Sequence, residues 1–457
     1  MHIFWHQRDL RIRDNSGLAA ATAADTTLPV YLVDPELRER IGARQWAFYM
    51  NGVQRLKNHY RELGSDLLVR TGPPVETLGE IADEYGVERF YYNRHYRPAR
   101  RARQRRLDAA LPTEPVTDLV LVGPEELDSQ YATHSQFYGD WQAVAKQTPH
   151  PTPSSETLAD VTDNTGVPAA EADIDLPEAG YRAARARYDR FLDAGIETYN
   201  DTRDDMAAAV DRPVGAVSRL SPYLAAGMIG IREVWADAAE RYEAAGSDTE
   251  RKNVDKFRYE LSWREQNYHL LYYNPDLPTE NYKQFPNKIP WENDPEQVAA
   301  WKQGQTGYPL VDAGMRQLNS EGYIHNRPRQ LVASLLTKHL LVDWRTGAAY
   351  FAEKLVDHDP ASNSANWQWI ASTGTDSVDV RIFDPVAQMA KYDDEAAYVT
   401  AYVPELRGVA AEKCIEWPNL STEERQALAP EYCEPIVDRN NAYERAQRVF
   451  ENALGKR

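Results

Sequence analysis

The amino-acid sequence predicts an α/β domain at the N-terminus followed by an all-helical domain. The chain has 457 residues, more than one ordinary hydrophobic core accommodates. Apolar runs alternate with amphipathic patterns up to residue 125, whereas only helical patterns follow residue 180. A segment rich in Pro, Ser, Thr and Asp separates the two regions. We therefore expect an α/β domain over residues 1–125, a long linker over 126–185 and a helical domain over 186–457.

Four apolar runs in the N-terminal region are typical of buried strands, namely HIFWH, LPVYLVD, DLLVRTG and RFYYNR. Two stretches among them carry apolar residues at helical spacing, RQWAFYMNGVQRLKNHYRELG and PVETLGEIADEYG. Because parallel strands are joined by helical crossovers, this alternation predicts a Rossmann-like parallel sheet with helices on both faces. No GxGxxG motif follows the first strand, so the usual dinucleotide-binding fingerprint is absent there.

Residues 149–180 contain no Lys or Arg, and their composition is typical of an exposed linker. Amphipathic helix patterns follow, namely GYRAARARYDRFLDAG, IREVWADAAERYEAAG, NVDKFRYELSWREQNYHLLYY, LVDAGMRQLNSEG and RQLVASLLTKHLLVDW. These patterns predict that the C-terminal domain is helical throughout.

The chain is strongly acidic, with a formal net charge of −18 and a pI near 5.1. This charge argues against a polyanionic partner, although a halophilic protein carries a similar excess as a solubility device. Its two cysteines, Cys414 and Cys433, suit a reducing compartment and exclude a disulfide scaffold. The sequence begins without a signal-peptide pattern and has no apolar run long enough to span a membrane. We expect a cytoplasmic protein.

The stretch SRLSPYL at 218–224 is typical of a helix start, with Ser221 as the N-cap and Pro222 in the first turn. Hydroxyl groups and Arg219 at such a start favour phosphate binding, but a capped helix alone explains the pattern as well.

Helical spacing places Glu260, Trp263, Arg264 and Asn267 on one face of a helix. A Trp among charged and amide side chains is slightly more typical of a pocket lining than of a solvated helix face. The stretch GYIHNRPRQ at 322–330 could contact phosphates or base edges, or could be only a basic helix start.

The densest basic run, NRHYRPARRARQRR at 93–106, holds seven Arg. It indicates either a solvated helix face or a site for an anion or nucleic acid.

Walker A, HExxH, CxxC and GxSxG motifs and a metal constellation are all missing. This favours chemistry that a cofactor performs.

Seven stretches, taken in order, resemble the photolyase/cryptochrome family from the first strand to about residue 406. They are FWHQRDLRIRDN, SRLSPYL, ELSWRE, WKQGQTGYPLVDAGMRQL, HNRPR, DHDPASNSANWQW and ASTGTDS…RIFDP. The resemblance implies the photolyase fold: an α/β antenna-type domain, a long linker and a helical FAD-binding domain. It also implies light-driven repair of cyclobutane pyrimidine dimers in UV-damaged DNA by electron transfer from reduced FAD, carried out by a monomer.

The resemblance implies a set of residues that bind FAD. The matching positions are Tyr199, Ser218, Arg219, Leu220, Ser221, Glu260, Arg264, Asn326, Arg329, Asp357, Asp359 and Asn363. Arg329 and Asp357 would form an ion pair near the isoalloxazine. Asn363 would face flavin N5, where a neutral amide favours stable reduced flavin.

Electron transfer and DNA binding are implied for further residues. The matching electron chain runs from the flavin to the surface through Trp367, Trp344 and Trp291. The matching dimer pocket contains Glu260, Trp263, Asn326, Arg327, Gln330 and Trp369. Trp263 and Trp369 would be the aromatic walls for a dimer flipped out of the duplex.

Two departures from the family pattern leave alternatives open. Gln330 stands where dimer photolyases often have Met, and Tyr323 replaces a frequent Trp. A cryptochrome-type blue-light receptor without repair activity is the main alternative, and a flavoprotein oxidoreductase active in the dark is a weaker one. For a second, antenna chromophore, the arginine run with Arg8 and Arg11 suits an anionic deazaflavin better than a folate.

Overall fold

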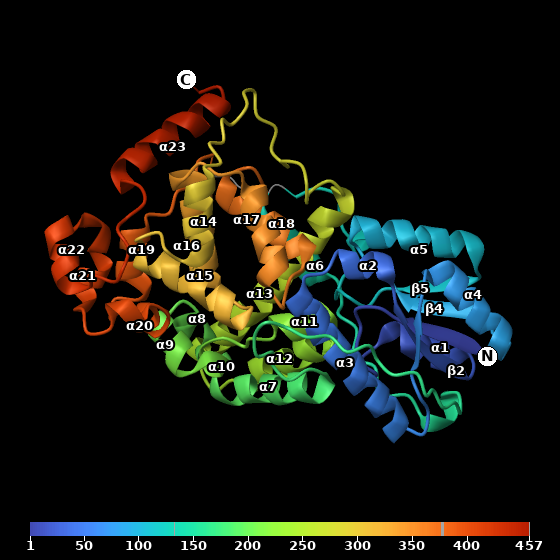
Figure 1. Cartoon of the computed structure of the whole chain (residues 1–457). Coiled ribbons are helices and arrows are strands. Elements are labelled where there is room, and N and C mark those ends of the chain that lie inside the picture. The colour runs from blue at the N-terminus through green and yellow to red at the C-terminus, as the bar shows by residue number, and fades with distance from the viewer. Residues whose placement is uncertain (132, 376–378, 457) are drawn as a thin grey trace. The chain divides into compact units, whose positions relative to one another are not determined.

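The computed structural model describes residues 1–131, 133–375 and 379–456 (Figure 1). By Cα proximity the chain forms two compact units, each assembled from separate stretches. Unit 1 comprises Met1–Glu197, Ser218–Asp276 and Val356–Ala361, and unit 2 comprises Thr198–Val217, Leu277–Leu355 and Ser362–Arg457. The domain boundaries expected near residues 125 and 185 rest on sequence composition, whereas these two units rest on which Cα atoms lie close together. The expected boundaries stay a prediction. Residues 376 and 377 of the ASTGTDS motif lie outside the described residues.

Unit 1 contains a five-stranded parallel sheet in the order β3-β2-β1-β4-β5. The strands are β1 (His2–His6), β2 (Thr27–Val33), β3 (Leu68–Thr71), β4 (Arg89–Asn93) and β5 (Thr113–Val116). The first four confirm the strands expected from the apolar runs. We did not predict β5, because Glu114 and Pro115 interrupt any apolar pattern. Pro115 is tolerated because β5 is an edge strand.

Helices cover both faces of this sheet, as the alternation predicted (Figure 1). On one face Ile3 and Trp5 pack with Leu78 of α4 (Pro74–Tyr85) and Leu107 of α5 (Pro98–Ala110). The opposite face carries α1 (Ser16–Ala24) and α3 (Ala43–Glu62), where the His6 imidazole bonds the Tyr60 hydroxyl at 2.7 Å. The short helix α2 (Pro35–Glu39) follows β2.

The expected linker contains more structure than its composition indicates. A ten-residue helix, α6 (His134–Ala143), lies in it and was not predicted. Residues 149–180 have little regular structure, but Leu158 and Ala159 are buried, and the Ala159 amide donates to the Thr27 carbonyl at 2.9 Å. The Asp163 carboxylate accepts from Lys57 at 3.0 Å. These anchors hold the segment against the α/β part of unit 1.

The remaining helices of unit 1 are α7 (Tyr181–Ala194), α11 (Ser221–Ala226), α12 (Ile231–Ala244) and α13 (Asp248–Tyr273). A buried ionic cluster joins α12 to the loop after β1: Arg232 pairs with Asp14 at 2.7 Å and with Asp118 at 2.5 Å. Arg11 also pairs with Asp118, at 2.6 Å. Gly230 allows this approach, because a Cβ there would lie 1.8 Å from an Asp14 carboxylate oxygen.

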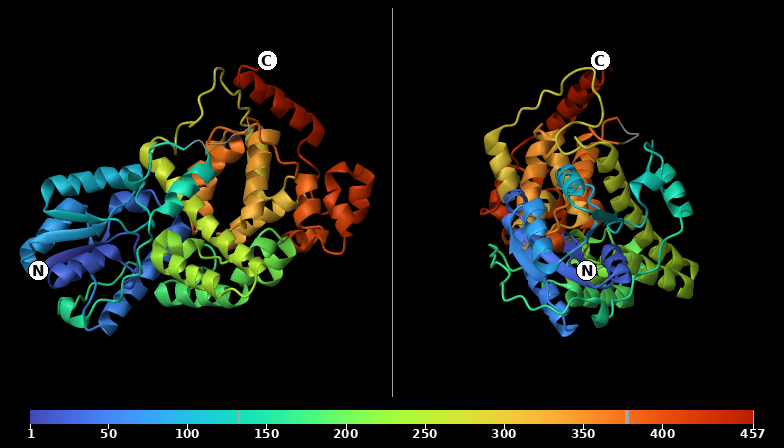
Figure 2. Two further views of the ribbon diagram at one scale, coloured as in Figure 1. Left: turned by 180° about the vertical axis from the view of Figure 1, so that it is seen from behind. Right: turned by 90° about the vertical axis from the view of Figure 1, so that its right-hand side faces the viewer.

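The regular elements described in unit 2 are helical, which confirms the class expected for the C-terminal region. They are α8 (Tyr199–Thr202), α9 (Met206–Asp211), α10 (Pro213–Ala216), α14 (Pro295–Gln303), α15 (Pro309–Glu321), α16 (Asn326–Ser334), α17 (Trp344–Lys354), α19 (Pro385–Tyr392), α20 (Ala397–Tyr402), α21 (Ala411–Ile415), α22 (Thr422–Leu428) and α23 (Arg439–Ala453), together with most of α18 (Pro360–Ala371). Helices α14, α15 and α16 are successive neighbours (Figure 2).

The single helix expected from RQLVASLLTKHLLVDW is wrong in its second half. Helix α16 ends at Ser334, a π-helical turn spans Leu335–His339, and Leu341 adopts a left-handed φ of 48°. Asp343 then caps α17 by accepting from the Arg345 amide at 3.0 Å. The apolar run continues through the break because its leucines remain buried, so periodicity alone did not reveal the break. No helix in the described part of the chain is both long and apolar enough to cross a membrane.

Candidate functional site

The segment 218–221 of unit 1 combines a strained backbone with hydrogen-bond donors. Arg219 has a φ of 48°, a left-handed conformation that costs on the order of 1–3 kcal/mol for a residue other than Gly. The Leu220 amide donates to the Ser218 hydroxyl at 3.4 Å. Ser221 is the first residue of α11 and Leu220 is the N-cap, so the expectation of Ser221 as the N-cap is wrong. Ser218 and Arg219 are half-buried and Ser221 is exposed. Two hydroxyls and a guanidinium in one short turn form a donor set that suits phosphate oxygens.

The predicted face of Glu260, Trp263 and Arg264 lies on α13 of unit 1, and all three side chains are half-buried. Glu260 pairs with Lys256 at 2.7 Å, one helical turn away. The Arg264 guanidinium donates to the Leu119 carbonyl at 3.0 Å and lies over the Tyr268 ring. The charged ends of Glu260 and Arg264 therefore already have partners within unit 1.

The Trp263 indole has a partner that sequence reasoning missed. The His134 imidazole, at the start of α6, stacks on it with ring centroids 3.7 Å apart and an interplanar angle of 6°. No local spacing connects residues 134 and 263, so only the fold reveals this contact.

The carboxylate of Asp359 lies in a buried network in unit 1. It accepts from Arg8 at 2.7 Å, from Arg97 at 3.4 Å and from the Tyr268 hydroxyl at 2.5 Å. Burial alone would raise the pKa of Asp359, but Arg8, Arg97 and the Tyr268 hydrogen bond hold that pKa far below its usual range. Asp359 also accepts from the Ala361 amide at 3.0 Å and so supports the start of α18. Asp357 is buried in the same loop.

Helix α16 in unit 2 carries the predicted residues of the HNRPR motif. Asn326 is exposed at its start, while Arg327 is buried. Arg327 pairs with Asp204 at 2.8 Å, donates to the Gln330 side chain at 2.9 Å and lies over the Tyr392 ring. A DNA phosphate would therefore compete with Asp204, a residue that sequence reasoning missed.

Two further predicted FAD ligands lie in unit 2. The Arg329 guanidinium donates to the Ile324 carbonyl at 2.7 Å and lies over the Tyr323 ring. Tyr199 is half-buried at the start of α8.

Helix α18 carries the predicted site residues Asn363 and Trp369 and their neighbours Asn366 and Gln368. These four side chains have different surroundings in unit 2. Asn363 donates to the Ala348 carbonyl of α17 at 3.0 Å, which orients its amide. Exposed Asn366 donates to the Ser362 carbonyl at 2.7 Å within its own helix. Half-buried Trp369 lies under the Arg381 guanidinium, 4.1 Å from the ring centroid. Buried Gln368 donates to the Leu277 carbonyl at 2.7 Å.

The three predicted electron-chain tryptophans belong to one core of unit 2. Trp367 and Trp344 are buried, with 3% and 0% exposure, and half-buried Trp291 packs against the same core. Gly347 allows α17 to approach α18 closely, because a Cβ there would lie 2.1 Å from the Trp367 ring. Trp301, which we did not single out, contacts Trp367 edge-on with centroids 6.1 Å apart. The aromatic core thus extends from a buried indole to one that reaches solvent.

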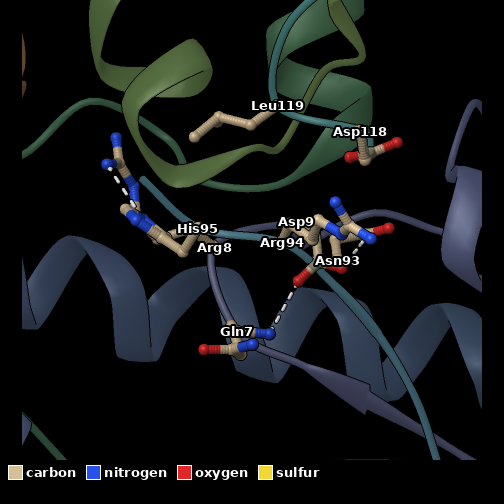
Figure 3. A pocket seen from close by; sticks show the side chains of 8 residues that line it. All are labelled: Gln7, Arg8, Asp9, Asn93, Arg94, His95, Asp118 and Leu119. Carbon is tan, nitrogen blue, oxygen red and sulfur yellow. Dashed lines mark hydrogen bonds between the residues drawn. The ribbon is translucent and has the colours of Figure 1, made fainter. Parts of the chain in front are cut away.

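The arginine run of unit 1 is partly buried and partly exposed, so each of its two interpretations, an anion site and a solvated helix face, fits some of its residues. Arg97, Arg100 and Arg103 are buried, whereas Arg105 and Arg106 are exposed on α5. Arg103 pairs with Asp34, and both Arg100 and Arg103 donate to the Gln7 side chain. A small pocket beside this cluster lies at the carboxyl ends of β1 and β4 (Figure 3). It is lined by Gln7, Arg8, Asp9, Asn93, Arg94, His95, Asp118 and Leu119.

The predicted site residues therefore fall into two sets. Unit 1 holds Ser218, Arg219, Leu220, Ser221, Glu260, Trp263, Arg264, Asp357 and Asp359. Unit 2 holds Tyr199, Trp291, Asn326, Arg327, Arg329, Gln330, Trp344, Asn363, Trp367 and Trp369. The ion pair expected between Arg329 and Asp357 would join the two sets, and it stays a prediction.

Comparison with known proteins shows the family. Residues 257–452 match the family model described as the FAD binding domain of DNA photolyase, and residues 2–156 match the one described as DNA photolyase. A deoxyribodipyrimidine photo-lyase of Halobacterium salinarum is 40% identical over 485 residues, which cover 100% of each chain.

Solved structures share the fold over nearly the whole chain. An archaeal photolyase from Sulfolobus tokodaii with two FAD molecules has a TM-score of 0.84 and 31% identity, covering 98% of this chain and 99% of its own. A cryptochrome of Synechocystis sp. PCC6803 has a TM-score of 0.88 and 26% identity, with the same coverage. These likenesses confirm the predicted fold, and together with the two family models they show that the chain belongs to the DNA photolyase family.

Proposed function

We propose that the chain repairs cyclobutane pyrimidine dimers in UV-damaged DNA by light-driven electron transfer from reduced FAD. The observation that carries this proposal is the match over both whole chains to a relative named deoxyribodipyrimidine photo-lyase, because it covers every segment that the sequence motifs occupy. The chain would act as a monomer in the cytoplasm.

The donor chemistry of the predicted FAD ligands fits that cofactor. The hydroxyls of Ser218 and Ser221 and the Arg219 guanidinium suit its pyrophosphate, and the Asn363 amide suits a ring nitrogen. The remaining ligands would be Tyr199, Leu220, Glu260, Arg264, Asn326, Arg329, Asp357 and Asp359. When bound and reduced, FAD would supply an electron on illumination and receive it back, so that two carbon–carbon bonds of the dimer break without net redox change.

The side chains proposed for DNA binding would receive a dimer that has left the base stack. Trp263 and Trp369 would stack on it, each stacked base contributing about 1–3 kcal/mol. Arg327 would contact a backbone phosphate, and Gln330, which accepts a hydrogen bond from Arg327 at 2.9 Å, would lie beside it. Such contacts position the damaged strand without reading its sequence.

Asn363→Asp is expected to shift the resting flavin toward its oxidised form and to speed its reoxidation in air. Asp cannot make the Asn363 hydrogen bond to the Ala348 carbonyl, and an ionised carboxylate would face that oxygen and oppose negative charge on reduced flavin. Visible absorption of the purified holoprotein measures both effects. Asn366→Asp is the matched control, since among the described residues this exposed amide donates to the Ser362 carbonyl of its own helix. Identical spectra and reoxidation rates for Asn363→Asp and the wild type would contradict the placement of Asn363 at the flavin.

We also infer that unit 1 binds an anionic second chromophore, a deazaflavin in preference to a folate. Arg8, Arg97, Arg100 and Arg103 are all buried, and the carboxylates of Asp34 and Asp359 pair with three of them. Burial, followed by the charges of Arg103, Arg97 and Arg8, lowers the pKa of Arg100 well below its usual value. Its Nε and Nη2 atoms have no hydrogen-bond partner within the described residues. An anion beside this cluster would stabilise it.

Arg100→Met is expected to lower the amount of deazaflavin that the protein retains, because it removes a buried positive charge and two donors. The protein is mixed with deazaflavin and desalted, and the ratio of deazaflavin to FAD is measured by absorption and mass spectrometry. Arg105→Met, on the exposed side of α5, should retain the wild-type ratio. Equal ratios in all three proteins would refute the anion site.

The proposed repair is tested by producing the chain in a bacterium that lacks its own photolyase. After UV irradiation, survival should rise only when the cells are then kept in visible light. Survival that rises equally in the dark would contradict light-driven repair. The likeness to a cryptochrome supports the receptor alternative, for which the flavin would respond to light while survival stayed at the level of the host.

A further inference from the structure

Trp263 is one of the two aromatic walls proposed for the dimer, and His134 stacks on it. The two rings are nearly parallel, with centroids 3.7 Å apart. His134 is 7% exposed, whereas Trp263 is half-buried. The imidazole therefore covers one face of the indole, and a flat ligand can stack only on the opposite face.

Both nitrogens of the His134 ring are held by hydrogen bonds. The Ser262 hydroxyl donates its single proton to the Tyr259 carbonyl at 2.7 Å, so it accepts from His134 Nε2 at 2.9 Å. His134 Nδ1 then carries no proton and accepts from the Tyr259 hydroxyl at 2.9 Å. These bonds fix one neutral tautomer and set the plane of the ring.

Burial, together with the charge of Lys256, lowers the pKa of His134 to about 4, so the ring is neutral near pH 7. A neutral, hydrogen-bonded ring is a stable surface for the indole to pack against. Tyr259 also contacts Trp263 edge-on, with centroids 6.5 Å apart. The indole is thus restrained from two sides, which reduces the side-chain entropy lost when a base stacks on it.

We propose that His134 is a positioning residue for the DNA lesion: its stacked ring holds the Trp263 indole in the orientation that receives a pyrimidine on the opposite face. This inference rests on the proposed function, because it takes Trp263 as a wall of the dimer pocket. His134 acts through Trp263 and makes no contact with the reacting bonds.

The test compares affinity with repair in the FAD-loaded full-length chain. The dissociation constant is measured by fluorescence anisotropy with a labelled oligo(dT) that carries one thymine dimer. His134→Ala should weaken binding roughly tenfold, because the Trp263 indole would lose the ring that holds it in the stacking orientation. The repair yield at saturating DNA should stay within about twofold of the wild type, because the flavin and electron chain are untouched.

Four further variants separate positioning from general structural damage. His134→Phe retains a stacking ring and should restore most of the affinity. His269→Ala is the matched control. His269, on α13, is a buried histidine like His134 and bonds the Asp128 carbonyl at 2.7 Å, but it has no described contact with Trp263. It should bind like the wild type. Adding His134→Ala to Trp263→Ala should cause no further loss, because the imidazole acts only through the indole.

Wild-type affinity in His134→Ala, a His134→Phe protein as weak as His134→Ala, or an equal loss in His269→Ala would each overturn the positioning role. Additive losses in the double variant would overturn it as well. If the wild type itself failed to prefer the dimer-containing oligo(dT) over undamaged oligo(dT), the proposed function would fail and this inference with it. The wild-type measurement therefore distinguishes the two failures.

Discussion

Trp344→Phe should nearly abolish photoreduction of oxidised FAD while leaving repair by chemically reduced protein intact. Trp344 is fully buried in the core that also contains Trp367, and the Gly347 contact brings its helix close to α18. A phenyl ring is far harder to oxidise than an indole, so the path proposed from half-buried Trp291 through Trp344 to Trp367 would be interrupted. The rate is measured by visible absorption under blue light with an external reductant.

Trp417→Phe is the matched control for this prediction. Trp417 is also fully buried in the core of unit 2, but it packs on Tyr432 and is not one of the three matching positions. Trp344→Phe also removes the hydrogen bond from the indole to Asn281, at a cost of about 1 kcal/mol, which the protein should tolerate. Photoreduction at the wild-type rate in Trp344→Phe would show that electrons follow another path, for which Trp301 is the first candidate.

Asp118→Ala should lower the free energy of unfolding by about 3–5 kcal/mol, because it leaves Arg11 and Arg232 as buried charges without this carboxylate. Asp118 is 2% exposed and also accepts from the Ser16 amide at 2.9 Å, so the cluster joins three parts of unit 1. Urea denaturation measures the loss. Glu114→Ala, which breaks the exposed pair with Arg89, should cost less than about 1 kcal/mol.

The pH dependence of this loss follows from the ionisation of Asp118. Burial would raise the pKa of Asp118, but Arg11 and Arg232 hold it well below its usual value. A carboxyl with a lowered folded pKa stabilises the fold fully above its unfolded pKa of about 3.9 and loses this effect as the pH falls. The difference between wild type and Asp118→Ala should therefore be constant above about pH 5 and shrink in acid. A difference that grew in acid would contradict the ionic account.

Local patterns in the sequence were sufficient to predict four of the five strands and several of the helices. Apolar runs identified four strands, and helical spacing identified α3, α4, α7, α12, α13 and α15, because these patterns reflect which side of an element is buried. The edge strand β5 was missed because Glu114 and Pro115 interrupt its apolar pattern. Helix α6 was missed because polar residues dominate it. The break after α16 was missed because buried leucines continue through it.

The site was predictable only as far as residue types in motifs allow. The motifs predict roles for Asn363, Arg327 and the three tryptophans, and these roles stay predictions, but the motifs give no sign of the groups that contact these side chains. The Ala348 carbonyl of the preceding helix orients the Asn363 amide. Asp204 pairs with Arg327 and His134 stacks on Trp263, both from distant parts of the chain. Such contacts depend on how helices pack, and no spacing in the sequence encodes them.

The most direct test of the account is repair by the purified chain. Reduced, FAD-loaded protein is mixed with UV-irradiated oligo(dT) and illuminated while absorbance at 260 nm is followed, with an unilluminated sample as the control. The account predicts that absorbance at this wavelength recovers only under light, as thymine dimers are split and their bases regain conjugation. A flat trace under light from protein that retains reduced FAD would contradict it.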